Sequence, residues 1–253
     1  KRTDLKGVFQ RLRFIAVLTG LAGLAIWYVL RGGPVLAYLS VAIAIWLLLA
    51  TLREWTVRIR LFDVPMSESI RRARNLPRAS HGMTMAHAGL AIAMFGFVGS
   101  SAWKSEEIVF VQPGSVIEIA GFDVRFDGVE RVRGPNYFAD RGTLTVSWEG
   151  ELVTTLYPER RSYPVAQSRT TESAIRSTLA GDLYASLAEP ASEAASDQGA
   201  WTLRILYEPL VFFIWMGSIM MIFGGGLSLS DRRLRVGAPR RAIKSKIVAT
   251  PAE

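Results

Sequence analysis

The stretch GMTMAHAGLAIAMFGFVGS, residues 82–100, decides the fold class of this chain. The eighteen residues that follow Gly82 contain a single ionisable side chain, His87. An α-helix rises about 1.5 Å per residue, so a run of this length can cross a hydrocarbon core of about 30 Å. The stretch therefore predicts a membrane-spanning helix with a histidine inside it.

His87 needs a role, because an unpaired polar group in hydrocarbon costs several kcal/mol. It could make one hydrogen bond across a helix–helix contact, or it could ligate a metal or haem iron. A proton path is disfavoured, since such paths usually need intramembrane carboxylates and no apolar run here has one in its middle. The residues around His87 are small: Ala86, Ala88, Gly89, Ala91 and Ala93. They would let either a helix or a large flat group approach the backbone, so both alternatives stay open.

Three further apolar runs accompany this stretch. Residues 14–52 predict a transmembrane hairpin, which turns at Arg31-Gly32-Gly33-Pro34. Residues 207–229 predict a last span, with aromatic rings near its start that suit a membrane interface. None of these runs has a polar face, which argues against helices of a soluble protein. The chain is therefore expected to cross the membrane four times.

The distribution of charge predicts the orientation. Residues 1–13 carry five basic and one acidic side chain, residues 53–81 carry seven and three, and residues 230–253 carry seven and two. Residues 101–206 are acidic, with fifteen acids against ten bases. Short basic segments that flank apolar spans indicate the cytoplasmic side, so 101–206 is expected on the other side. The net charge of +8 thus reflects topology, and nucleic-acid binding is not expected.

The basic loop 53–81 contains a predicted helix. Pro65-Met66-Ser67-Glu68-Ser69 resembles a helix start, with Ser67 or Ser69 as the cap. A short helix at the membrane surface would suit this segment, whose arginines would meet lipid head groups.

Residues 101–206 change to short β runs. The runs 107–111, 115–119, 122–126, 143–148 and 152–157 are separated by turn residues, and Trp201 begins a last strand. Gly134-Pro135-Asn136-Tyr137 is expected to be a turn. The predicted fold is thus a polytopic α-helical membrane protein with four spans and a small antiparallel β domain, extracytoplasmic, inserted before the last span.

Cysteine is absent, which excludes disulfides, cysteine–zinc sites and thiol catalysis by this chain. The two histidines, His81 and His87, are too few for a multi-histidine metal centre. The chain opens at Lys1 with a polar basic stretch and no cleavable signal pattern, so we expect a processed piece or fragment of a larger protein.

Several motifs occur in a familiar order. They are GMTMAHAGLA (82–91), GPNY (134–137), RRSYPV (160–165), TESAIRS (171–177), DLYASLAE (182–189) and the run from Gly199 to Arg233. This order resembles the C-terminal part of CcmF, the large membrane subunit of the bacterial cytochrome c maturation system. The resemblance covers roughly residues 80–235, about three-fifths of the chain.

The resemblance implies a role in haem handling. Family members act as haem lyases, which take haem from a haem chaperone and promote its attachment to the Cys-x-x-Cys-His motif of apocytochrome c. They hold a b-type haem in the membrane between two axial histidines, and His87, in its AHAG context, matches one of them. A neutral imidazole nitrogen would then bind the haem iron while the other ring nitrogen is fixed by a neighbour.

Other parts of the family pattern are missing from this sequence. They are the tryptophan-rich haem-binding segment, its flanking histidines and the second axial ligand. His81 lies six residues from His87 and cannot reach the opposite face of the same haem from one helix, so it is expected to be an interfacial side chain. Haem b would be shared with a ligand outside this chain, which is not expected to be catalytic alone and for which no catalytic residue is assigned.

The resemblance also predicts partners and location. The partners would be the N-terminal remainder of the lyase, the haem chaperone, apocytochrome c with its presenting subunits, and membrane lipids. The expected location is the bacterial inner membrane, or the mitochondrial inner membrane for an organellar protein, with the β domain periplasmic. The acidic balance of 101–206 could steer a basic apocytochrome. Rival hypotheses are a cofactor-free scaffold, which would not need His87, and a transporter subunit, which the lack of charge within the spans disfavours.

Overall fold

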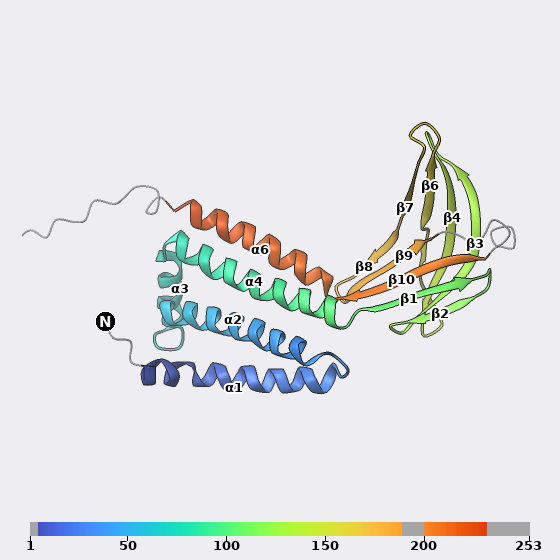
Figure 1. Ribbon diagram of the computed structural model, residues 1–253. Helices are drawn as coiled ribbons and strands as arrows, with labels where there is room; N and C mark the ends of the chain where they lie inside the picture. Colours follow the sequence, from blue (N-terminus) through green and yellow to red (C-terminus); the bar gives the residue numbers. More distant parts are fainter. Residues whose placement is uncertain (1–4, 189–199, 232–253) are drawn as a thin grey trace, which may run out of the picture.

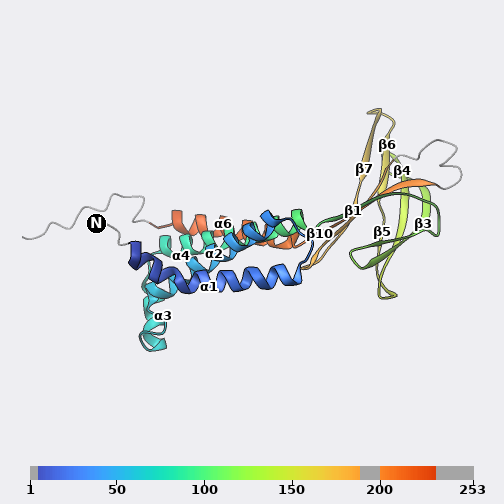
Figure 2. The same ribbon diagram turned by 60° about the horizontal axis from the view of Figure 1, so that its bottom comes forward.

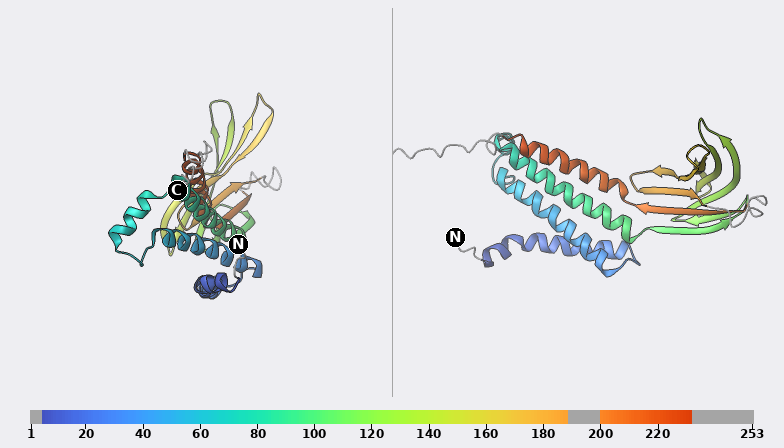
Figure 3. Two further views of the ribbon diagram at one scale, coloured as in Figure 1. Left: turned by 90° about the vertical axis from the view of Figure 1, so that its left-hand side faces the viewer. Right: turned by 45° about the horizontal axis from the view of Figure 1, so that its top comes forward.

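A computed structural model describes residues 5–188 and 200–231 of the chain. The spanning helices are α1 (Leu5–Val29), α2 (Val35–Ile59), α4 (Arg78–Ala102) and α6 (Val211–Leu229). They lie side by side in the order α1, α2, α4, α6, as one layer (Figures 1 and 3). All four are long and apolar enough to cross a membrane, which confirms the four predicted spans.

The helix boundaries differ from the predicted ones at the polar ends. The second helix continues through Arg53 and Arg58 to Ile59, and α4 begins at Arg78, so both take up parts of the predicted basic loop. Arginine stems can lie along apolar surface while the charged heads reach water, so the helices extend past the apolar runs. At the other end, the last strand continues to Pro209, and α6 therefore starts at Val211 instead of residue 207.

The surface helix predicted in the basic loop is present as α3 (Met66–Asn75). Figure 2 shows α3 running crosswise to the spanning helices. The predicted serine cap is wrong: Pro65 occupies the N-cap with φ −55° and ψ 148°, and no side chain caps the helix. The fixed φ of proline sets the entry into the helix, and the Ser69 hydroxyl instead donates to the carbonyl of Arg60 at 3.4 Å.

The two ends of the helix layer carry different structures. The α1–α2 turn and the β domain lie at one end, whereas α3 and the C-terminal end of α6 lie at the other (Figure 1). This is the grouping that the charge distribution predicts. The assignment of the two ends to cytoplasm and periplasm stays a prediction, and residues 1–4 and 232–253 of the basic segments lie outside the described residues.

The β domain consists of two antiparallel sheets. Its strands are β1 (Ser105–Val111), β2 (Val116–Ile119), β3 (Phe122–Arg133), β4 (Phe138–Trp148), β5 (Glu151–Leu156), β6 (Glu159–Tyr163), β7 (Ser168–Glu172), β8 (Ala174–Ser177), β9 (Gly181–Leu187) and β10 (Trp201–Pro209). One sheet has the order β1-β10-β9-β8, and the other has the order β2-β3-β4-β6-β7 with β5 beside β4. Because β1 follows α4 and β10 precedes α6, the first sheet joins the domain to the helices.

The core lies between these sheets. Phe126, Leu144, Leu203 and Ile205 are fully buried there, with Trp201 at its edge. The predicted β runs are all strands, and GPNY is a turn in which the amide of Gly134 donates to the carbonyl of Tyr137 at 2.9 Å. The sequence analysis did not find β6 to β9. The segments of β6 and β7 are polar and lack apolar alternation, whereas β9 does alternate, with Leu183, Ala185 and Leu187 in the core, and could have been found.

Candidate functional site

The candidate helix α4 lies between α2 and α6 and packs most closely against α6. Gly82, Gly89 and Gly96 recur every seven residues and lie on one face. A Cβ on Gly89 would come within 2.7 Å of the carbonyl oxygen of Gly217, and a Cβ on Gly224 within 2.6 Å of the amide nitrogen of Ala86. The two backbones therefore touch, and no side chain fits between them.

His87 lies on the opposite face of α4. At about 100° per residue, it is turned nearly half a circle away from Gly89. Its side chain is exposed, and so are Leu90 and Phe97 on the same face, at 41% and 65%. The histidine therefore points away from the α4–α6 contact, onto an open apolar side of the helix layer.

One hydrogen bond fixes the His87 ring. Its Nδ1 lies 2.8 Å from the carbonyl oxygen of Met83, one turn earlier in the same helix. A carbonyl oxygen only accepts, so Nδ1 must carry the proton and donate. In the neutral imidazole, Nε2 then carries the lone pair, and this is the tautomer that can bind a metal ion through Nε2. Since this bond stays within α4, it does not join His87 to a neighbouring helix.

His81 has a different role. Its Nε2 lies 2.9 Å from the carbonyl oxygen of Ala73 and ties α3 to the start of α4. Both histidines lie on α4, about 9 Å apart along the axis and about 120° apart around it. This separation argues against His81 as a second ligand to the same iron, and its place at the membrane interface stays a prediction.

Two further contacts hold the start of α4. The Nη1 atom of Arg58 donates to the Ser80 hydroxyl at 2.6 Å, which links α2 to α4. The amide of Ala79 donates to the buried carboxylate of Asp231 at 3.1 Å, just after α6. A carboxylate at a helix N-terminus binds unpaired amides and complements the helix dipole. The helix that carries His87 is thus anchored to both neighbours.

The described residues provide one ligand at this place. Among residues 5–188 and 200–231, no three His, Cys, Asp or Glu side chains come together as a metal site would require. The one other histidine of the sequence, His81, lies about 9 Å away along the same helix and is bonded to Ala73, so a haem iron held by His87 would need its other axial ligand from elsewhere. The site fits such a group in three respects: Nε2 is available, the ring is oriented by Met83, and Leu90 offers apolar surface for a macrocycle.

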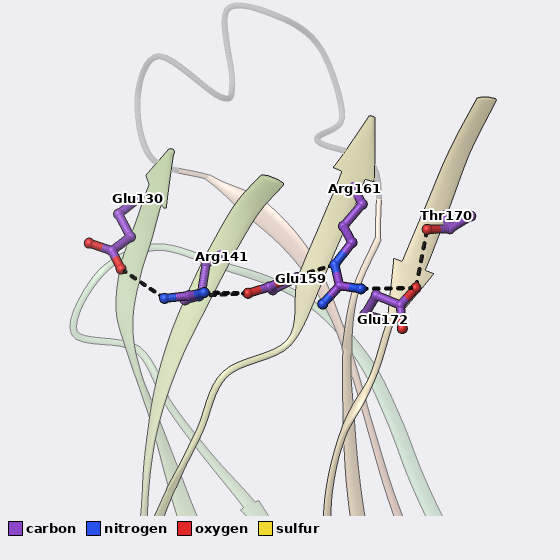
Figure 4. A network of polar contacts seen from close by, with 6 residues as sticks. All are labelled: Glu130, Arg141, Glu159, Arg161, Thr170 and Glu172. Atoms are coloured by element: carbon purple, nitrogen blue, oxygen red, sulfur yellow. Dashed lines mark hydrogen bonds and ion pairs between the residues drawn. The ribbon is translucent and has the colours of Figure 1, made fainter. Parts of the chain in front are cut away.

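A second polar feature lies in the β domain. Figure 4 shows a row of charges that alternates across β3, β4, β6 and β7: Glu130, Arg141, Glu159, Arg161 and Glu172. Glu159 is only 6% exposed and lies 2.6 Å from Arg141 and 2.8 Å from Arg161. Burial raises the pKa of the Glu159 carboxyl, but hydrogen bonds from both arginines outweigh this, and the net pKa is lowered. The row is a structural ion-pair network.

The sequence analysis found one of these features in part and missed two. It expected that a helix could approach the small residues around His87, and the close contact of Gly89 with α6 confirms this, but it did not use the spacing of seven in Gly82, Gly89 and Gly96, which Gly217 and Gly224 mirror. The Asp231 cap and the Glu159 network join residues far apart in the chain, and no local pattern marks them.

Comparisons with known proteins now place the chain. A family model described as the CcmF C-terminal beta-sandwich matches residues 102–209. The chain is 40% identical over its whole length to the cytochrome c-type biogenesis protein CycK of Bradyrhizobium diazoefficiens, of which it covers 37%. It is 37% identical to the cytochrome c-type biogenesis protein CcmF of Pseudomonas aeruginosa, over 78% of this chain and 28% of the relative.

A solved structure agrees with these matches in fold. The chain superposes on a cytochrome c heme lyase CcmF with a TM-score of 0.64 and 19% identity, over 91% of this chain and 35% of that one. The chain thus spans about a third of the length of the relatives it matches. It belongs to the CcmF family and corresponds to its C-terminal part, which includes the β-sandwich.

Proposed function

We propose that this chain forms the C-terminal part of a cytochrome c haem lyase and that His87 supplies one axial ligand to a b-type haem in the membrane. The observation that carries the proposal is the state of His87: it is exposed on an apolar helix face, with Nδ1 bonded to Met83 and Nε2 available. A histidine that only contacts solvent, or only packs against another helix, would not require an oriented ring with an available Nε2.

The relatives support the wider role. CycK and CcmF are both named for cytochrome c biogenesis, and the solved structure is named as a haem lyase. We infer the same pathway for this chain, in a bacterial inner membrane and with the β domain on the periplasmic side. The partners would be the rest of the lyase, a haem chaperone, and apocytochrome c with its presenting subunits.

The residues of this chain would hold and shield the haem. Met83 fixes the imidazole plane through its carbonyl, and Leu90, one turn beyond His87, would pack on the macrocycle and exclude water. The Arg58–Ser80 and Asp231–Ala79 contacts would keep α4 in place while partners bind. A bound b-type haem supplies one-electron transfer, which would keep the incoming haem iron reduced during attachment.

A maturation assay tests this proposal. Cells that lack their own lyase would express the complete protein as wild type, His87→Ala or His81→Ala, together with a reporter c-type cytochrome. We expect covalent haem in the reporter to fall to background in His87→Ala and to persist in His81→Ala, at equal membrane levels of each variant. Full maturation with His87→Ala would overturn the role of His87 and favour the cofactor-free scaffold.

A further inference from the structure

The turn between β8 and β9, residues 178–180, lies where the β domain meets α6 (Figure 1). The amide of Leu210, the residue before α6, donates to the carbonyl of Ala180 at 2.9 Å. Leu179, in the middle of the turn, is 66% exposed. A single exposed leucine is ordinary on a water-facing surface, so the meaning of this exposure depends on where the turn lies relative to the membrane.

The β8–β9 turn is held in one shape. The amide of Thr178 donates to the carbonyl of Gly181 at 3.0 Å, and the Thr178 hydroxyl donates to the same carbonyl at 2.7 Å. Gly181 packs directly on β10, since a Cβ at this position would come within 2.6 Å of the carbonyl oxygen of Glu208. The turn therefore keeps a fixed position relative to the start of α6.

The length of α6 places the β8–β9 turn at the membrane boundary. The helix is apolar enough to cross a membrane and has 19 residues. It therefore rises about 28 Å, close to the thickness of a hydrocarbon core of about 30 Å. A spanning helix with so little spare length begins at the edge of the core. Leu210 precedes this helix and is bonded to Ala180, so the turn lies at the same edge.

An exposed apolar stripe on α6 leads to Leu179. The stripe lies on one face of α6, opposite the glycines that contact α4, and consists of Phe212, Trp215, Ile219 and Ile222. At its upper end, Leu179 lines one hollow together with Phe212 and Trp215. The other residues that line this hollow are polar: Ser177, Thr178 and Asp182. A change from apolar to polar lining matches the boundary between acyl chains and lipid head groups.

We propose that the β8–β9 turn is a lipid-binding surface, which enters the leaflet nearer the β domain and places Leu179 among the acyl chains. The bilayer is the occupant of this surface because Leu179 continues the exposed stripe of a spanning helix. The β domain would then contact the membrane directly, in addition to its connections through β1 and β10. This proposal does not depend on a haem at His87.

Site-specific labels test the proposal, and the absence of cysteine in this chain allows one label per protein. The full chain, in nanodiscs, would carry Leu179→Cys, Ile222→Cys or Phe110→Cys, each coupled to a fluorescent label. Ile222 is 72% exposed and lies about 16 Å beyond the start of α6, which makes it the lipid reference. Phe110 is 74% exposed and lies about 17 Å along β1 from Ser105, which makes it the water reference.

Two quenchers read the surroundings of each label. We expect the label at Leu179 to lose fluorescence with lipids that carry a nitroxide next to the head group, and to be protected from iodide in the water. The label at Ile222 should respond most to a nitroxide near the end of the acyl chain, and the label at Phe110 only to iodide. Circular dichroism equal to that of wild type would show that each labelled protein is folded.

Two results would overturn the proposal. Iodide quenching at Leu179 as strong as at Phe110 would place the β8–β9 turn in water. Protection of Leu179 from both quenchers would place it against protein and not against lipid.

Discussion

The two faces of α4 differ in what covers them. On the glycine face, Gly82, Gly89 and Gly96 bring the backbone of α6 into direct contact. On the other face, His87, Leu90 and Phe97 are exposed. One side of α4 is therefore a packing surface, closed by backbone contact with α6. The other side presents an oriented imidazole and can serve as a binding surface. The small residues near His87 illustrate the division, since Ala86, Gly89 and Ala93 contact α6 and leave no room for a cofactor on that side.

A substitution on the glycine face should have the largest effect on folding. Gly89→Val would place atoms within 2.7 Å of the Gly217 carbonyl and 2.9 Å of the Met220 Cβ. We expect the helices to separate, with a loss of about 3 kcal/mol or more, measured as loss of folded protein in detergent. Gly225→Val is the control, because nothing lies within 4 Å of a Cβ at Gly225. Equal stability of the two variants would show that the glycine contact does not hold α4.

The β domain contains a second closely packed group, the buried carboxylate of Glu159 between Arg141 and Arg161. Glu159→Gln should destabilise the β domain by about 2 kcal/mol, because two charge-assisted hydrogen bonds to Arg141 and Arg161 are weakened. Denaturant titration followed by the fluorescence of the tryptophans, one of which, Trp201, is in the core, would measure the loss. A change below a few tenths of a kcal/mol would mean that the network does not stabilise the fold.

The pH dependence of the unfolding free energy tests the role of Glu159 in a second way. The pKa of Glu159 is lower in the folded protein than the ordinary value of 4.5. Its contribution to stability is therefore present above pH 4.5 and is lost as pH falls through the lowered folded pKa. Wild type should lose more unfolding free energy on acidification than Glu159→Gln does. Parallel curves for the two proteins would contradict the assignment.

A substitution on the open face should have the smallest effect on folding. Leu90→Ala truncates a side chain that is 41% exposed. We expect a change in stability within about 0.5 kcal/mol, measured beside Gly89→Val in the same detergent. Comparable losses in both variants would mean that the two faces of α4 are not different after all.

Much of the fold follows from local patterns in the sequence. Apolar runs long enough for a membrane predict α1, α2, α4 and α6, and the β runs with their turns predict most of the larger sheet. The serine cap of α3 was predicted wrongly, because the helix begins directly after Pro65 and both Ser67 and Ser69 lie inside it. The strands β6 and β7 were missed, because Glu159, Glu172 and their arginines pair across strands and do not need apolar alternation. The alternation of Leu183, Ala185 and Leu187 in β9 was overlooked.

The sequence predicts which residue forms the candidate site, but it does not predict how that residue is exposed and oriented. A lone histidine in an apolar run identifies His87, but its exposure and its bond to Met83 need the packed helices. Which of the small residues near His87 pack against another helix likewise depends on where α6 lies. The position of α6 follows from contacts between residues more than 100 positions apart in the chain.

The most direct measurement is a reduced-minus-oxidised visible spectrum with pyridine extraction on the purified complete protein. It would compare the wild type with two variants of α4. His87→Ala changes the exposed face of the helix, and His81→Ala changes the contact with α3. If His87 binds the haem from the exposed face of α4, the b-type signal disappears in His87→Ala, with the protein still assembled, and stays in His81→Ala. An undiminished b-type signal in His87→Ala would contradict it.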